Sequence, residues 1–119
     1  MTDEEQTLLS LMGYVFMESA RPDKAAVVLA ALDALAPGQP AVLRALVLAQ
    51  LRSGKASRAL ALLDQLAMAG GVDAAFHLLR AQALAALERP EEAAAAMQNY
   101  VHMRKDVAEA APPLALKVP

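Results

Sequence analysis

The sequence predicts an all-α protein of three helix-turn-helix repeats, and three observations support this. Long apolar stretches with helical spacing are interrupted by polar turns at Ala20–Ala25, Gly54–Ala59 and Glu88–Ala93. These turns recur with a fixed period of 34 residues. Hydrophobic residues make up 57% of the chain but aromatic residues only 3%, which suits close helix packing better than a sheet. Such a period indicates paired helices that bury their apolar faces by stacking.

Apolar positions repeat in the same frame as the turns. Each turn ends on an alanine, and an apolar residue follows four positions later and again three positions after that. The positions are Ala25, Leu29 and Leu32, then Ala59, Leu63 and Leu66, then Ala93, Met97 and Tyr100. A period shared by turns and apolar positions is not a product of composition alone, so we interpret the repeat as real.

Start and stop residues predict six antiparallel helices joined by short connections. Thr2 and Glu5 have capping-box spacing, and Asp73 can cap a later helix. Pro22, Pro40 and Pro90 suit first helical positions. The predicted helices cover about 3–19, 22–36, 40–54, 56–68, 74–87 and 90–105.

The chain is predicted to divide into a repeat domain at 1–105 and a tail at 106–119. The tail contains Pro112, Pro113 and Pro119 and has no sustained apolar period. We expect it to be flexible and suited to serve as a linear docking segment.

Composition excludes several classes of function. The formal charge is −2 and the eleven Lys and Arg residues are scattered, whereas nucleic-acid binding needs clustered positive charge. The absence of cysteine rules out disulfides and thiolate metal sites. The longest uninterrupted apolar run, Ala25–Leu32, is too short to cross a bilayer, and the N-terminus is acidic. These features favour a cytoplasmic protein.

No residues combine into a catalytic, metal or cofactor site. His77 and His102 are far apart in sequence and lack a histidine partner at helical spacing. Glu91 and Glu92 stand at a predicted helix start, where acidic residues stabilise the positive end. Gly70–Gly71 lacks the Lys and Ser/Thr of a phosphate-binding loop. We therefore expect no enzymatic activity and no cofactor.

The frame resembles the tetratricopeptide repeat. Small, alanine and proline positions of that pattern are matched by Gly13, Ala25 and Pro37 in the first unit, by Gly54 and Ala59 in the second, and by Ala81 and Ala93 in the third. Gly71 replaces the second proline. His77 and Arg80 occupy positions that are usually apolar, so the register of the fifth helix is the least well defined.

A more specific resemblance is to the small tetratricopeptide chaperones of bacterial type III secretion. The segments LLSLMGYVFMES, VVLAALDALAP, FHLLRAQALAAL and MQNYVHMRK follow one another as they do in the YscY-type (SctY) family, over about 8–105. This resemblance implies a non-catalytic bacterial cytoplasmic chaperone that binds and stabilises a secreted YscX-type export component. It also implies that the two together contact the inner-membrane export gate.

The family pattern also implies which residues bind the partner. The second helix of each unit is densely apolar and is expected to be buried on most sides, which leaves the first helices to line a concave groove. The implied groove residues are Ser10, Tyr14, Met17, Arg44, Leu48, Leu51, Leu78, Gln82 and Ala85. Such a surface suits an amphipathic partner helix, and Arg44 can pair with a partner carboxylate.

Alternatives remain open at this stage. Tyr14 and Met17 also fit core packing, and Arg44 fits a solvated helix surface. Leu48 and Leu51 are the stronger groove candidates because other apolar residues of their helix can face inward. A chaperone for a needle subunit or a translocator, or a general repeat adaptor or scaffold, are alternative functions. Uncapped apolar ends also predict self-association in the absence of the partner.

Overall fold

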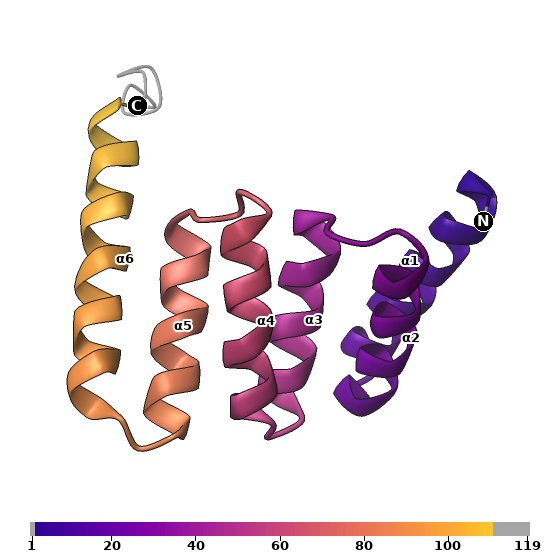
Figure 1. Cartoon of the computed structure of the whole chain (residues 1–119), viewed down its shortest axis with the longest axis horizontal. Helices are drawn as coiled ribbons and strands as arrows, with labels where there is room; N and C mark the ends of the chain where they lie inside the picture. Colours follow the sequence, from indigo (N-terminus) through magenta and orange to yellow (C-terminus); the bar gives the residue numbers. More distant parts are fainter. Residues whose placement is uncertain (1, 111–119) are drawn as a thin grey trace, which may run out of the picture.

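The computed structural model describes residues 2–110 of the chain, and within them the predicted all-α repeat fold is confirmed. Six α-helices follow one another in a row, with α1 and α2 at one end and α6 at the other (Figure 1). The helices are α1 (Asp3–Glu18), α2 (Pro22–Leu35), α3 (Pro40–Arg52), α4 (Ala56–Met68), α5 (Ala74–Ala86) and α6 (Pro90–Ala110).

The predicted helix starts are confirmed by their capping groups. The Glu5 amide donates a hydrogen bond to Thr2 Oγ1 at 3.1 Å, and the Phe76 amide donates to Asp73 Oδ1 at 2.8 Å. Helices α2, α3 and α6 begin at prolines, whose missing N–H costs nothing at a position without an intrahelical acceptor. Local sequence therefore determines where these helices begin.

Four helix ends share one hydrogen-bonding pattern, and three of them carry the repeat period. After α1 the Arg21 amide donates to the Phe16 carbonyl and the Ala20 amide to the Met17 carbonyl, and equivalent bonds close α3, α4 and α5. This is the Schellman motif, which needs one residue in the left-handed conformation. At the three turns within repeats that residue is Ala20, Gly54 or Glu88, with φ of 57°, 77° and 59°.

The repeated alanines lie where neighbouring helices approach most closely. Ala25 and Ala59 are 0% exposed and pack among residues of the following helix pair. Ala93 is only half-buried, because no helix pair follows α6 in the described part of the chain. A Cβ on Gly13 would meet Leu29 Cδ2 at 3.1 Å, so a small residue there lets α1 lie against α2.

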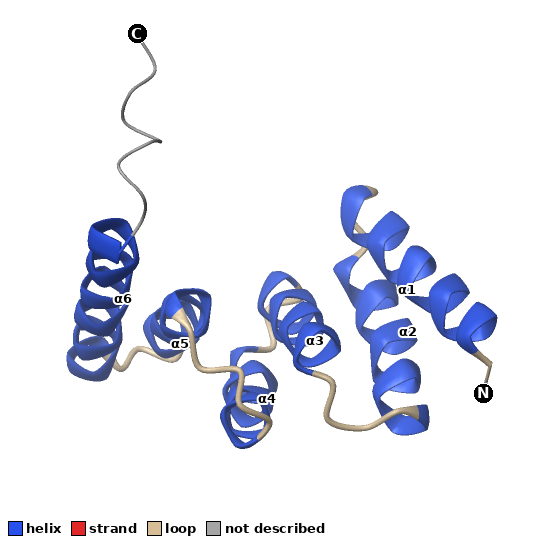
Figure 2. Cartoon of the chain, turned by 90° about the horizontal axis from the view of Figure 1, so that it is seen from above, coloured by secondary structure: helices blue, strands red, loops and turns tan. Residues whose placement is uncertain are grey.

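The expectation that the second helices are buried on most sides is wrong. Helices α3 and α5 each bury five residues, whereas α2 and α4 each bury four and leave Val27, Leu35 and Met68 exposed. Helix α3 contacts α2, α4 and α5, so more of its surface is covered. Figure 2 shows α4 set to one side of α3 and α5. The expectation rested on the high alanine content of α2 and α4. Alanine has a high helix propensity whether its side chain is buried or exposed, so it does not indicate burial.

The predicted end of the last helix is also wrong. Helix α6 passes Arg104 and Lys105 and continues to Ala110. The residues after Asp106 include good helix formers, and the first proline comes only at Pro112. The predicted tail begins inside this helix, and its remainder at 111–119 lies outside the described residues.

Candidate functional site

Two neighbouring apolar cavities that share lining residues lie above α3, and we call them together the groove. One cavity of about 460 Å³ lies between α1, α2 and α3, and another of about 410 Å³ lies between α3 and α5. Three α3 residues line both: Ala41, Ala45 and Leu48. The groove therefore follows one face of the three first helices.

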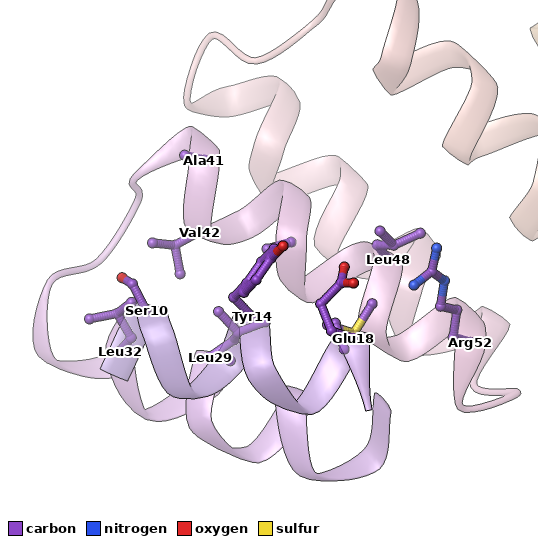
Figure 3. A pocket seen from close by; sticks show the side chains of 12 residues that line it. Ser10, Tyr14, Glu18, Leu29, Leu32, Ala41, Val42, Leu48 and Arg52 are labelled. Carbon is purple, nitrogen blue, oxygen red and sulfur yellow. The ribbon is translucent and has the colours of Figure 1, made fainter. Parts of the chain in front are cut away.

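The wall formed by α1 comes from residues spaced one turn apart. Ser10, Tyr14 and Glu18 stand in sequence along α1 and face Val42, Leu48 and Arg52 of α3 (Figure 3). Positions four residues apart share one face of a helix, so the sequence spacing places all three on the groove. Leu29 and Leu32 of α2 form part of the lining. Tyr14 is 63% exposed, which identifies it as a surface residue rather than a core residue.

One end of the groove carries charge. Glu18 and Arg52 line the first cavity, and neither forms an ion pair with a side chain that the structure describes. The rest of that cavity is lined largely by apolar side chains with Ser10 and the Tyr14 hydroxyl. An apolar channel with polar groups at its margin matches a ligand helix that is itself amphipathic.

Arg44 has its carboxylate partner within the chain. Its Nη2 lies 3.1 Å from Oδ2 of Asp73, the N-cap residue of α5. Asp73 also caps α5 through its other oxygen. This ion pair ties α3 to α5, and the pairing of Arg44 with a partner carboxylate stays a prediction.

Of the nine residues implied for partner binding, the structure brings six together in the groove. Ser10, Tyr14, Met17 and Leu48 line the first cavity, and Arg44 and Leu78 join Leu48 in the second.

The other three lie elsewhere. Gln82 and Ala85 line a separate hollow of about 640 Å³ between α5 and α6. Leu51 lies in a hollow of about 360 Å³ near the turn between α3 and α4, with Ala86 and Leu87. Leu51 also packs against the central core cluster, so the structure does not place it beside Leu48 in the groove. The two leucines are one helical turn apart, but they line different hollows.

Sequence reasoning missed several groove residues that helical spacing could have identified. Ala41, Ala45, Leu48 and Arg52 are separated by four, three and four residues and form a single stripe on α3. Ala41 and Ala45 were missed because alanine side chains are too small to mark an apolar face. Glu18 was also missed, although it follows Tyr14 by one helical turn on α1. Counting in helical steps from the predicted groove residue Leu48 identifies the other three residues of the stripe.

A comparison with protein-family models matches residues 16–83 to the tetratricopeptide repeat. The chain belongs to the tetratricopeptide repeat family. The match extends from the last turn of α1 into α5, and it includes all of the second repeat. No curated protein matches the chain. Membership of a repeat family of protein-interaction scaffolds indicates a role in protein–protein interaction.

The fifth helix, whose register was least certain, follows the repeat frame. Ala81 is buried like Val47 at the equivalent position one repeat earlier, and Phe76, Leu79 and Ala83 join the central core. His77 is half-buried, with its ring edge-on to Phe76 at 5.3 Å. Within residues 2–110 no three His, Asp or Glu side chains gather as metal ligands. Likewise, none of the helices described is long and apolar enough to span a membrane.

Proposed function

We propose that the protein is a non-catalytic binding chaperone whose groove holds an amphipathic helix of a partner protein. The observation that carries this proposal is the pair of adjoining apolar cavities on one face of α1, α3 and α5, joined at Leu48. An amphipathic helix presents anchors at positions i, i+3, i+4 and i+7, which suits a row of neighbouring cavities. Each large apolar anchor that is fully buried contributes about 1.5–3 kcal/mol.

The polar margin gives the bound helix a preferred direction. Glu18 and Arg52 lie at the same end of the first cavity and are available for charged groups of a ligand. Charged pairs at a margin contribute more to orientation and association rate than to affinity. Met17, which also lines this cavity, has a flexible side chain that adapts to the shape of a ligand.

The partner proposed is a YscX-type secreted export component in the bacterial cytoplasm, bound before it reaches the inner-membrane export gate. The sequence resemblance over 8–105 to YscY-type chaperones supports this identity, and membership of the repeat family agrees with it. The chaperone covers apolar helices that would otherwise aggregate. Chaperoning a needle subunit or a translocator, or general adaptor activity, uses the same groove with a different ligand.

The identity of the partner is tested by co-expression with the YscX-type component of the same secretion system. The molar mass of the purified material is measured by light scattering after size exclusion. We expect a soluble complex of defined stoichiometry that contains both chains. Separate elution of the two chains at micromolar concentration contradicts the YscX-type assignment and favours the adaptor alternative.

A further inference from the structure

Helices α1 and α6 lie at opposite ends of the row of helices (Figure 1). Each carries a stripe of exposed apolar side chains. The first, on α1, is called the head stripe and comprises Leu8, Leu11, Met12 and Val15. The second, on α6, is called the tail stripe and comprises Ala94, Met97 and Val101. Residues spaced by three and four positions share a helix face, so each stripe is continuous.

Two of the head-stripe positions, those of Leu8 and Val15, are buried in both other repeats. One and two repeats further along, Val15 is replaced by Ala49 and Ala83, which are both 0% exposed. Ala49 packs against residues of α2, and Ala83 packs against residues of α4. These α1 positions are therefore the ones that a first helix uses to contact the second helix of a preceding repeat.

The tail stripe is the other half of the same contact. The equivalents of Met97 in the earlier repeats are Leu29 and Leu63, which are 5% and 0% exposed, whereas Met97 is 41% exposed. Leu29 shares a core cluster with α3 residues, and Leu63 shares one with α5 residues. Met97 is exposed because no first helix lies beyond α6 in the described chain.

We propose that a second copy of this chain occupies these surfaces, with the tail stripe of one copy packed on the head stripe of the next. The junction between copies then repeats the contact that already joins α2 to α3 and α4 to α5 within each copy. The two surfaces differ, so the association is heterologous and extends the row in one direction. It leaves the groove free, because the groove uses a different face of α1.

Charge complementarity favours this arrangement. Consecutive helices in the row are antiparallel, so the C-terminal end of α6 would lie beside the N-terminal end of α1 from the next copy. Arg104 and Lys105, followed by Asp106, are exposed at the first end. Asp3, Glu4 and Glu5 are exposed at the second. Exposed charges of opposite sign attract weakly and are screened by salt, so we expect the association to weaken as ionic strength rises.

The test uses two full-length variants, each with one stripe blocked. The head variant carries Leu11→Glu and Val15→Glu, and the tail variant carries Met97→Glu and Val101→Glu. The molar mass of each is measured by sedimentation equilibrium over a range of concentrations, with circular dichroism to verify the helical content. We expect the wild-type mass to rise with concentration, each variant alone to be monomeric, and their equimolar mixture to form a dimer with one copy of each.

The mixture decides between modes of association. It contains one intact tail stripe and one intact head stripe on different molecules, so head-to-tail packing forms a single junction and stops there. A monomeric wild type, a tail variant that still dimerises, or a mixture that stays monomeric overturns the proposal. If a stripe variant loses helicity, Arg104→Glu with Lys105→Glu is used instead. That variant is expected to weaken association at least fivefold at low salt, and unchanged association overturns the proposal.

Discussion

Exchanging glycine and non-glycine residues at the three left-handed turn positions provides a quantitative test of the repeat. Ala20, Gly54 and Glu88 occupy one repeat position, with φ of 57°, 77° and 59°. A side chain in this conformation costs about 1–2 kcal/mol. Replacing it by glycine also raises the entropy of the unfolded chain, which offsets about 0.4–1 kcal/mol. The net expectation is that Ala20→Gly and Glu88→Gly each stabilise the protein by about 0.5–1 kcal/mol.

The reverse exchange at the middle turn should have the opposite sign. A Cβ at Gly54 meets no atom within 4 Å, so Gly54→Ala tests backbone conformation without a steric clash. We expect it to destabilise the protein by about 0.5–1 kcal/mol. The free energy of unfolding is measured by urea titration monitored by circular dichroism.

A glycine within a helix serves as the matched control. Ala61 is exposed in the middle of α4, and Ala61→Gly is expected to cost about 1 kcal/mol. If Ala20→Gly and Glu88→Gly destabilise the protein as Ala61→Gly does, the three turns do not share the left-handed conformation and the reasoning is refuted.

Three further predictions concern packing and capping, and all are checked by urea unfolding. Ala25→Leu and Ala59→Leu should each lower the free energy of unfolding by about 1–3 kcal/mol because both alanines are fully buried. Ala93→Leu should lower it by less than half as much, because Ala93 is only half-buried. Equal losses at all three positions would contradict the repeat packing. Gly71→Ala should lower the free energy of unfolding by about 1–3 kcal/mol because the new Cβ would clash with the side chain of the fully buried Leu66. An unchanged urea midpoint would show that Gly71 does not lie so close to Leu66. Asp73→Ala should lower the free energy of unfolding by about 1 kcal/mol through loss of the α5 cap. Asp73→Asn keeps a cap acceptor and loses only the half-exposed ion pair with Arg44, so it should change stability by less than about 0.5 kcal/mol. Equal losses in the two variants would assign the effect to the ion pair.

The helices and their caps could be predicted from sequence because the signals that define them are local. Thr2, Asp73 and the helix-starting prolines act on adjacent backbone groups, so their effect is visible without knowledge of the fold. The left-handed turns were only partly visible. Glycine identifies the turn at Gly54, whereas the equivalent conformation at Ala20 and Glu88 is imposed by the repeat context.

The groove was harder to predict because it depends on how helices face one another. Leu48 and Leu51 have the same chemistry and lie one turn apart, but Leu48 lines both cavities of the groove, whereas Leu51 lines a separate hollow near the turn between α3 and α4. The internal ion pair of Arg44 depends on Asp73, which is distant in sequence. Such long-range pairings are absent from a periodic pattern.

Ala41 is the most informative position for testing the groove. It is exposed, it lines both cavities, and it lies in the first turn of α3. A glutamate there interacts favourably with the positive end of the helix, so Ala41→Glu places a charge in the groove without disturbing the fold. Ala61→Glu, on an exposed face of α4 away from these cavities, is its matched control.

The most direct test of the central claim is the affinity of these two variants for a fluorescently labelled YscX-type partner, measured by anisotropy titration. If the partner helix lies in the groove, Ala41→Glu should raise the dissociation constant at least tenfold, which corresponds to about 1.4 kcal/mol. Ala61→Glu should bind like the wild type. Equal affinities for the wild type and both variants would show that the partner binds elsewhere on the protein.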